Sequence, residues 1–202
     1  MLSNSRPDFV TTGSTVFAVN EIVNHLKPLL EGKEKEIDKV SEVCRHVGRF
    51  DKPSEIKTWL SRKDGGIRIT ALRVRNIEQI AQQMSGDVDF VAYVFCTEQF
   101  SYSRDQRAEV IATRLAKAML ANKGVPTANK KATNVNMDNL YSGDIDGLGL
   151  ALWSVTWSQN WVLDAPMNMS ELNDFETFHA STDDGQIPFE AEVVLTQAEQ
   201  EQ

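Results

Sequence analysis

Residues 149–163 alternate between large apolar and small polar positions along most of their length. One set of alternate positions carries Ala151, Trp153, Val155, Trp157, Trp161 and Leu163, and the other carries Ser154, Thr156, Ser158 and Asn160. Alternation with period two predicts a β-strand. A strand with one aromatic and one polar face favours a sheet that packs helices on one side and meets water or a partner on the other.

Residues near the N-terminus have the apolar spacing of a helix. A cap at Ser14 or Thr15 would start this helix, and Gly32 would stop it. Pro28 would kink the last turn, so the pattern leaves the helix end open by several residues. The apolar positions that share the helical spacing are Phe17, Val19, Ile22, Val23, Leu26, Leu29 and Leu30.

A longer helix is predicted from Ser103 to about residue 121, with Gly124 and Pro126 closing it. Its apolar stripe is made of Ala108, Val110, Ile111, Leu115, Ala118, Met119 and Leu120. A third, short helix is predicted over residues 52–60, because Pro53 suits a first helical turn.

Further strands are expected around these helices. Residues 67–74 alternate, and residues 88–97 have a continuous apolar centre typical of a strand covered on both faces. Residues 132–141 form another strand before a turn at 143–147. Residues 40–47 fit neither the helical nor the strand period cleanly, and we favour a strand there.

This order of elements predicts an α+β (α/β) fold with a single sheet of about four or more strands and helices packed on one face. We expect the α/β domain to span residues 1–163 and an extended C-terminal arm to span residues 164–202. Trp153 and Trp157 are expected to anchor the sheet to the long helix.

Charge is distributed unevenly along the chain, which has 202 residues and a net charge of −8. The arm holds ten of the 29 acidic residues and no Lys or Arg. Residues 1–163, which we call the body, are therefore close to neutral. An acidic protein of this kind is a poor candidate for sequence-independent DNA binding. Neither a membrane-spanning run nor a signal-peptide pattern is found in the sequence.

The arm is too apolar for a purely solvated spacer, because Phe175, Phe178 and Phe189 interrupt its acidic residues. Pro166 and the polar run after it indicate that the chain leaves the sheet. We therefore expect an arm that is poorly ordered in the free subunit and docks onto a neighbour through its aromatic residues.

Candidate metal ligands do not form a pattern. His25, His46 and His179 lack the spacing of ligand pairs and are interpreted as surface or packing residues. Asp144 and Asp146 resemble the start of a calcium loop, but the later ligands are missing, so a turn is predicted. We expect no metal and no cofactor.

Catalytic residues are equally hard to assign. Cys44 and Cys96 are interpreted as reduced cysteines buried in strands rather than as thiol nucleophiles. Asp87 and Asp89 could together bind a cation, but side chains that solvate a strand edge explain them better.

Three arginines, Arg68, Arg73 and Arg75, are candidates for a binding stripe. Arg68 is expected on the opposite face from Arg73 and Arg75, which would leave no single row for phosphate contacts. Since no combination of acid, base and nucleophile emerges, we expect a binding or assembly protein and not an enzyme.

Two segments, residues 53–74 and 139–159, resemble the tail terminator proteins of contractile-tailed, Mu-like bacteriophages. The specific part is an Asn-Leu-Tyr run at 139–141 followed by the pattern Gly-x-Ala-Leu-Trp-x-Val-x-Trp-x-Gln. That pattern is carried here by Gly149, Ala151, Leu152, Trp153, Val155, Trp157 and Gln159. In element order the resemblance extends over residues 15–163, and the acidic arm departs from it.

The resemblance implies an α/β subunit that forms a hexameric ring on the last ring of the tail tube. Such a ring would stop tube and sheath growth and join the tail to the head connector, with no catalytic residues. The implied partners are the tail tube protein, the tail sheath protein and head-tail connector or neck proteins, with DNA only passing through the lumen. The protein would be assembled in the host cytoplasm and reside in the virion, at the tail-neck junction. A neck or head-completion protein is the alternative.

Overall fold

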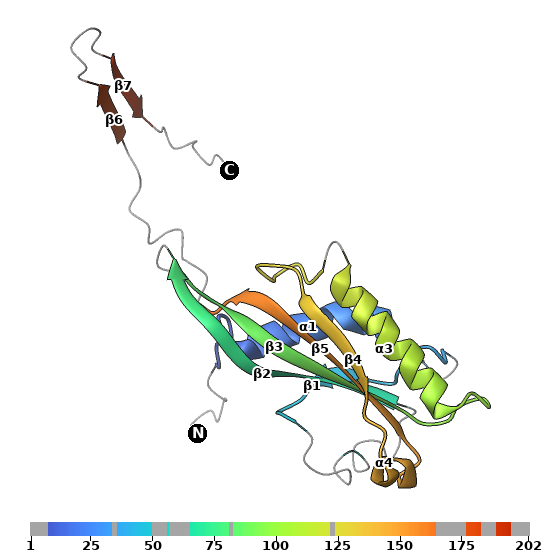
Figure 1. The fold of residues 1–202 in the computed structure, drawn as a ribbon. Coiled ribbons are helices and arrows are strands. Elements are labelled where there is room, and N and C mark those ends of the chain that lie inside the picture. Colours follow the sequence, from blue (N-terminus) through green and yellow to red (C-terminus); the bar gives the residue numbers. More distant parts are fainter. Residues whose placement is uncertain are drawn as a thin grey trace, which may run out of the picture. The chain divides into compact units, whose positions relative to one another are not determined.

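The computed structural model describes residues 8–33, 36–49, 56, 65–80, 83–121, 124–164, 177–182 and 189–194. The chain divides into two compact units, Met1–Ala165 and Pro166–Gln202 (Figure 1). The first unit contains a five-stranded sheet and three described helices. The expected α+β fold with a single main sheet is therefore confirmed.

The main sheet has the strand order β1-β2-β3-β5-β4. Its strands are β1 (Val43–Arg45), β2 (Gly65–Ile80), β3 (Gln83–Cys96), β4 (Thr133–Asn139) and β5 (Ala151–Val162). Only the β1–β2 pair is parallel, and every other neighbouring pair is antiparallel. The tryptophan-rich strand β5 thus lies inside the sheet, between β3 and β4.

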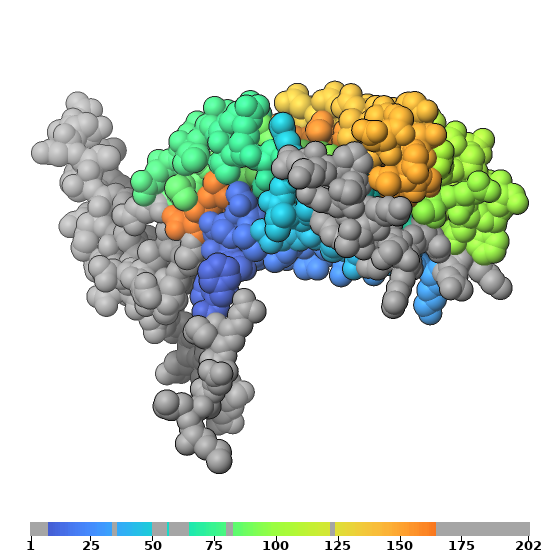
Figure 2. All heavy atoms as spheres, turned by 90° about the horizontal axis from the view of Figure 1, so that it is seen from below, coloured from blue at the N-terminus to red at the C-terminus, as the bar shows by residue number. Residues whose placement is uncertain are grey.

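The observed strands differ in length from the predicted ones. β1 covers only three residues of the segment 40–47, whereas β2 and β3 continue beyond the predicted ends into a long hairpin. β5 follows β3 along this hairpin, from Cys96 opposite Ala151 to Ser85 opposite Val162. In Figure 2 the hairpin, in green, lies beside the end of β5, in orange.

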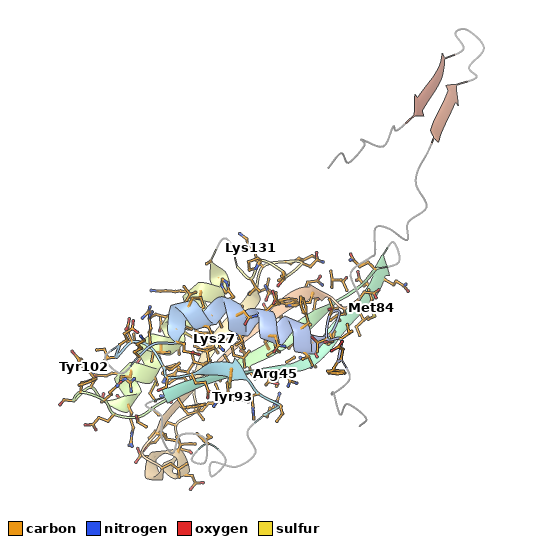
Figure 3. All side chains as sticks on the ribbon, turned by 180° about the vertical axis from the view of Figure 1, so that it is seen from behind. Lys27, Arg45, Met84, Tyr93, Tyr102 and Lys131 are labelled. Atoms are coloured by element: carbon orange, nitrogen blue, oxygen red, sulfur yellow. The ribbon has the colours of Figure 1, made fainter. Side chains whose placement is uncertain are left out.

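Helix α1 (Thr15–Leu30) begins and ends close to its predicted limits. The Ser14 side chain caps it by accepting a hydrogen bond from the backbone N–H of Phe17 at 3.3 Å. Pro28 lies inside the last turn without ending the helix, which stops at Leu30. Figure 3 shows α1 lying across the strands of the sheet.

Helix α3 (Arg104–Leu120) buries most of the predicted stripe, including Ala108, Ile111, Leu115 and Met119, but not all of it. Val110 is 50% exposed and Leu120 is 58% exposed, so both predicted core positions are wrong. Arg107 is buried instead, because its guanidinium donates to the carbonyls of Thr97 at 2.7 Å and Ile37 at 3.0 Å. The buried face of α3 thus includes an arginine that is hydrogen-bonded to two loops.

Helices α1 and α3 pack on one face of the sheet and enclose the first core. The largest fully buried side chains of this core are Ile22, Leu26, Leu30, Ile67, Ile69, Phe90, Ile111, Leu115, Trp157 and Trp161. Trp157 stacks on Phe90 with ring centroids 5.4 Å apart, and Trp161 meets the same ring edge-on at 6.3 Å. Trp153 packs against this core but is only half-buried.

The opposite face of the sheet carries a second, smaller core. Its buried members are Ile56, Val91, Tyr93, Phe95, Ile145, Leu150 and Leu152. Ile145 lies in α4 (Gly143–Gly147), a short helix where the sequence predicted a turn. Apart from Ile56, the helix predicted at 52–60 lies outside the described residues.

We predict that Trp157→Ala lowers the free energy of unfolding by about 3–5 kcal/mol, because it empties a fully buried aromatic site. Trp153→Ala is the matched comparison and should lower it by clearly less, since part of the Trp153 side chain is already in contact with solvent. Urea unfolding of the two variants measures both losses. Equal losses would contradict the assignment of Trp157 as the main anchor.

His25 makes the stability of the helix layer depend on pH. Burial lowers its pKa below the usual 6.5, and a backbone hydrogen bond at Ala118 offsets part of this effect. The unfolded chain therefore binds a proton at His25 more readily than the folded chain does. The stability that neutral His25 contributes is present above pH 6.5 and is lost as the pH falls below it.

We predict that urea unfolding of the native protein shows this loss between pH 7 and pH 5. His25→Leu should flatten the pH dependence over that interval. Comparing the slope with and without the imidazole separates His25 from the other groups that titrate there. An unchanged slope in the variant would contradict the assignment.

Candidate partner-binding surface

The residues of the sequence pattern at 149–159 serve mainly to hold the core together. Ala151, Trp153, Val155, Trp157 and Gln159 follow one face of β5 toward α1 and α3. Leu152 points to the second core, where it is 6% exposed. The predicted alternation of β5 is confirmed, and its aromatic face is the buried one.

Gly149 is required by the backbone before β5 begins. Its φ is +75°, in a region that favours glycine, and its N–H donates to the carbonyl of Asp146 at 2.9 Å. This bond closes α4 and directs the chain into the strand. Arg104 at the start of α3 also forms an ion pair with Asp146, so α4 is linked to the helix layer.

The aromatic residues proposed for the arm lie in the second unit. Phe175 lies outside the described residues, whereas Phe178 and Phe189 belong to β6 (Thr177–Thr182) and β7 (Phe189–Val194). These two strands pair antiparallel in a separate two-stranded sheet. The sequence patterns did not predict this ribbon.

A network of polar side chains occupies the part of the second sheet face that the second core leaves open. We call it the polar network, and its members are Arg73, Arg75, Asn76, Asp87, Asp89, Ser158 and Asn160. They come from three adjacent strands, β2, β3 and β5.

Asp89 is the centre of the polar network. It accepts hydrogen bonds from Arg73 at 2.6 Å, Arg75 at 2.7 Å and Ser158 at 2.6 Å. Burial alone would raise the pKa of Asp89, but the bonds from Arg75, Ser158 and Arg73 outweigh it and lower this pKa to about 2. Asp89 therefore stays a carboxylate, and three of its roughly four lone-pair sites already accept hydrogen bonds.

Asp87 extends the polar network toward the hairpin end. Asn160 donates to Asp87 at 2.8 Å and Asn76 donates at 2.9 Å, and these bonds lower the pKa of Asp87. Asn76 adopts a φ of +49°, which asparagine tolerates better than most residues. Both aspartates are thus held by neighbouring donors, which argues against the cation site considered for the pair.

A β-bulge corrects the predicted placement of the arginines. Ala71 pairs with Phe90 and Arg73 pairs with Asp89, so Leu72 is an extra residue in β2. The side chains of Arg73 and Arg75 consequently return to the face that Arg68 occupies opposite Tyr93. The prediction that Arg68 lies on the opposite face was wrong, because a strict period of two cannot register an inserted residue.

The two cysteines have different surroundings. Cys96 is fully buried in β3, and burial raises the pKa of its thiol to about 12, as expected for a structural cysteine. Cys44 lies in β1 but is only half-buried, where it accepts a hydrogen bond from Arg68. Within the described residues, no group of three or more potential ligands could hold a metal ion.

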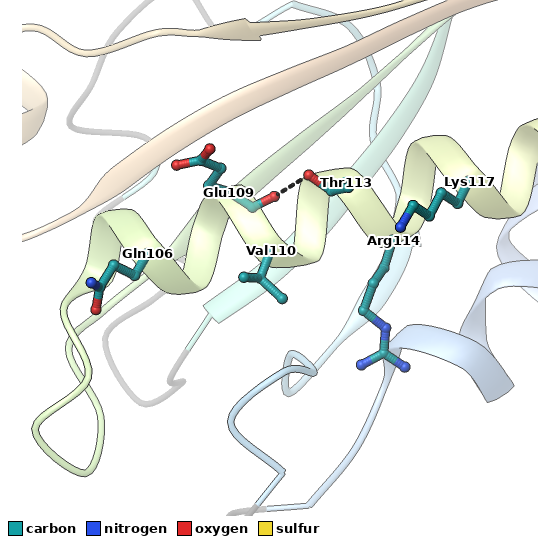
Figure 4. A pocket seen from close by; sticks show the side chains of 6 residues that line it. All are labelled: Gln106, Glu109, Val110, Thr113, Arg114 and Lys117. Atoms are coloured by element: carbon teal, nitrogen blue, oxygen red, sulfur yellow. Dashed lines mark hydrogen bonds between the residues drawn. The ribbon is translucent and has the colours of Figure 1, made fainter.

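Hollows lined by described residues lie elsewhere on residues 1–165. One, of about 540 Å³, follows the outer surface of α3 and is lined by Gln106, Glu109, Val110, Thr113, Arg114 and Lys117 (Figure 4). Arg114 is fixed there by an ion pair with Asp38. Another, of about 170 Å³, lies beside Gln159 and the loop that precedes β4.

Comparison with models of known protein families gives no match for this chain, and comparison with curated proteins gives none either. Over the stretch of chain with described structure, none of the helices is both long and apolar enough for a membrane span. The features that bear on function are therefore the sequence resemblance and the geometry of the body. This geometry is a sheet whose polar side chains are held in place by hydrogen bonds.

We predict that Asp89→Asn lowers stability at neutral pH, because it leaves Arg73 and Arg75 without their shared carboxylate. The stability contributed by a carboxylate of depressed pKa is present above its unfolded value near 4 and is lost as the pH falls toward 2. Between pH 5 and pH 2, the free energy of unfolding measured in urea should therefore fall more steeply with pH for the native protein than for the variant. Asp138→Asn, at an exposed site on β4, is the control and should change neither quantity.

Proposed function

We propose that this protein is a structural virion protein, a tail terminator that forms a ring at the end of a contractile phage tail. The observation that carries the proposal is the sequence pattern at 139–159, from the Asn-Leu-Tyr run to Gln159. In the structure this stretch runs from the end of β4 through α4 into the interior strand β5. The resemblance therefore includes the segment on which both cores are built.

The character of the surface supports an assembly role. The polar network holds its charged groups in fixed positions on an open sheet face, and such groups favour specific, oriented contacts between proteins. Arg73 and Arg75 remain 66% and 42% exposed while bound to Asp89, so they stay accessible to a partner.

A ring needs heterologous contacts, in which two different surfaces of each subunit meet and the rotation closes. The open sheet face and the outer surface of α3 differ in chemistry, so they could serve as the two surfaces of such a contact. In this proposal the partners are the tail tube protein, the tail sheath protein and the head connector, and the protein has no enzymatic activity of its own.

We predict a closed oligomer of six copies when the purified protein is mixed with tail tubes assembled from the tube protein of the same genome. Native mass measurement should show six times the chain mass of 22.6 kDa, alone or at the tube end. Electron microscopy should show a cap at one end of each tube, and capped tubes should not lengthen further.

A protein that stays monomeric in the presence of tubes would contradict the proposal. Binding to tailless heads with no binding to tubes would favour the alternative, a neck or head-completion protein. The two assemblies can be tested in parallel with the same preparation.

A further inference from the structure

A small cavity lies where the loop before β4 meets β5. It has a volume of about 170 Å³ and is lined by Gly124, Val125, Pro126, Ala128, Asn129, Lys130, Lys131 and Gln159. Only Gln159 belongs to the sheet, and every other lining residue lies in the loop between α3 and β4.

Gln159 contributes a buried polar side chain to the wall of this cavity. Its side-chain N–H donates to the carbonyl of Lys130 at 3.0 Å, and the residue is 2% exposed. The amide cannot be turned around, because its oxygen would then face another oxygen. The side-chain oxygen of Gln159 is therefore an acceptor, and it has no donor among the described residues.

The loop wall of the cavity is held in place by its own hydrogen bonds. Asn129 donates from its backbone and its side chain to Asn160, at 3.1 and 2.7 Å. Ala128 donates to the carbonyl of Val125 at 3.1 Å, and Gly124 turns the chain with a φ of +47°. The cavity thus exists before any ligand arrives, which reduces the ordering cost of binding.

The chemistry of the lining defines a ligand. The side-chain oxygen of Gln159 is buried without a donor among the described residues, and a peptide N–H that reached it would supply one. Val125, Pro126 and Ala128 provide apolar walls, and the space suits one small side chain. Lys130 and Lys131 are exposed neighbours that place positive charge at the rim.

We propose that this cavity binds an extended acidic peptide, supplied by the C-terminal residues of a second copy of this chain. Residues 164–202 contain ten acidic residues and no Lys or Arg. Within them, β7 reads Phe-Glu-Ala-Glu-Val-Val and is already an extended strand. Its alternation brings carboxylates and small apolar residues together on one short segment, which is the combination that the cavity requires.

The assignment to a second copy rests on the proposed ring, in which each subunit has a neighbour. Contacts of this kind would link successive subunits without using the polar network. The cavity itself can be tested apart from the ring, by adding the peptide in trans.

The first experiment uses a synthetic peptide of residues 186–202 and the full-length protein. We expect saturable binding that weakens as salt rises, because charge pairs at the rim are screened. A peptide with its acidic residues replaced by the corresponding amides should bind at least tenfold more weakly. Equal binding of the two peptides would overturn the proposal.

Variants localise the binding. Ala128→Phe enlarges a side chain that lines the cavity, and it should reduce peptide binding at least fivefold. Because Ala128 also packs against the first core, the urea unfolding curve of the variant is recorded first to establish that it is folded. Ala121→Phe changes an exposed alanine outside the cavity and is the matched control. If Ala128→Phe binds like the native protein, the peptide lies elsewhere and the cavity holds only water.

The second experiment identifies the source of the peptide. Equal amounts of unlabelled and ¹⁵N-labelled full-length protein are mixed, joined by a carbodiimide, and digested for mass spectrometry. We expect crosslinks from Lys130 or Lys131 to Glu190 or Glu192 that join labelled with unlabelled chains. Crosslinks confined to single chains would overturn the assignment to a second copy.

Oligomer mass, recorded on the same samples, separates this inference from the proposed function. Rings without crosslinks between copies would defeat the inference and leave the ring standing. Peptide binding by a protein that never forms rings would defeat the ring and the second-copy source, but not the acidic-peptide site.

Discussion

The pairing of β3 with β5 is the constraint on which the rest of the body depends. The two strands are aligned over twelve residue pairs without a bulge, from Cys96–Ala151 to Ser85–Val162. Alternate residues of both strands supply the first core, and the residues between them supply the second core or the polar network. A slip of one residue would exchange the faces and expose Trp157 and Trp161, so the stack of Trp157 on Phe90 fixes the register.

The same pairing explains why one surface can be both rigid and polar. Asp89 and Ser158 are directly opposite each other, as are Asp87 and Asn160. Each pair therefore reaches its hydrogen-bonding distance through the backbone ladder, without long flexible side chains. The arginines of β2 add charge to a layer whose positions are already set, and a partner would meet a surface that needs little reordering.

The sequence allowed the elements to be predicted where one periodicity dominated over a long stretch. β5, α1 and α3 were found in this way, because burial on one face leaves a repeat of two or of 3.6 residues. The prediction was wrong at Val110 and Leu120, because both lie at the edges of the apolar stripe of α3 and are exposed. It also missed Arg107, whose burial depends on carbonyls of Ile37 and Thr97 that no local pattern connects to it.

The candidate surface was harder to predict, because its geometry depends on contacts between distant residues. The sequence indicated Asp87 and Asp89 as a pair of neighbouring carboxylates. The side chains that donate hydrogen bonds to them lie on two other strands, which a local pattern does not connect to them. Gln159 stood in a recognised sequence pattern, yet its partner Lys130 precedes it by 29 residues. A single sequence indicates which residues alternate along a strand, but it does not indicate which loop will contact them in the folded protein.

The extra residue at Leu72 has a consequence for how this protein can change over evolutionary time. Leu72 and Arg73 both face the same side of the sheet, and the outer hairpin is offset by one position from the inner strand. If Leu72 were deleted, Arg73 would follow Ala71 directly and keep its place opposite Asp89, so Arg73 and Arg75 would stay on the same face without the bulge. In homologous chains a change of one residue in a single strand of this hairpin should therefore coincide with a gained or lost bulge, whereas a change without a bulge should occur equally in both strands.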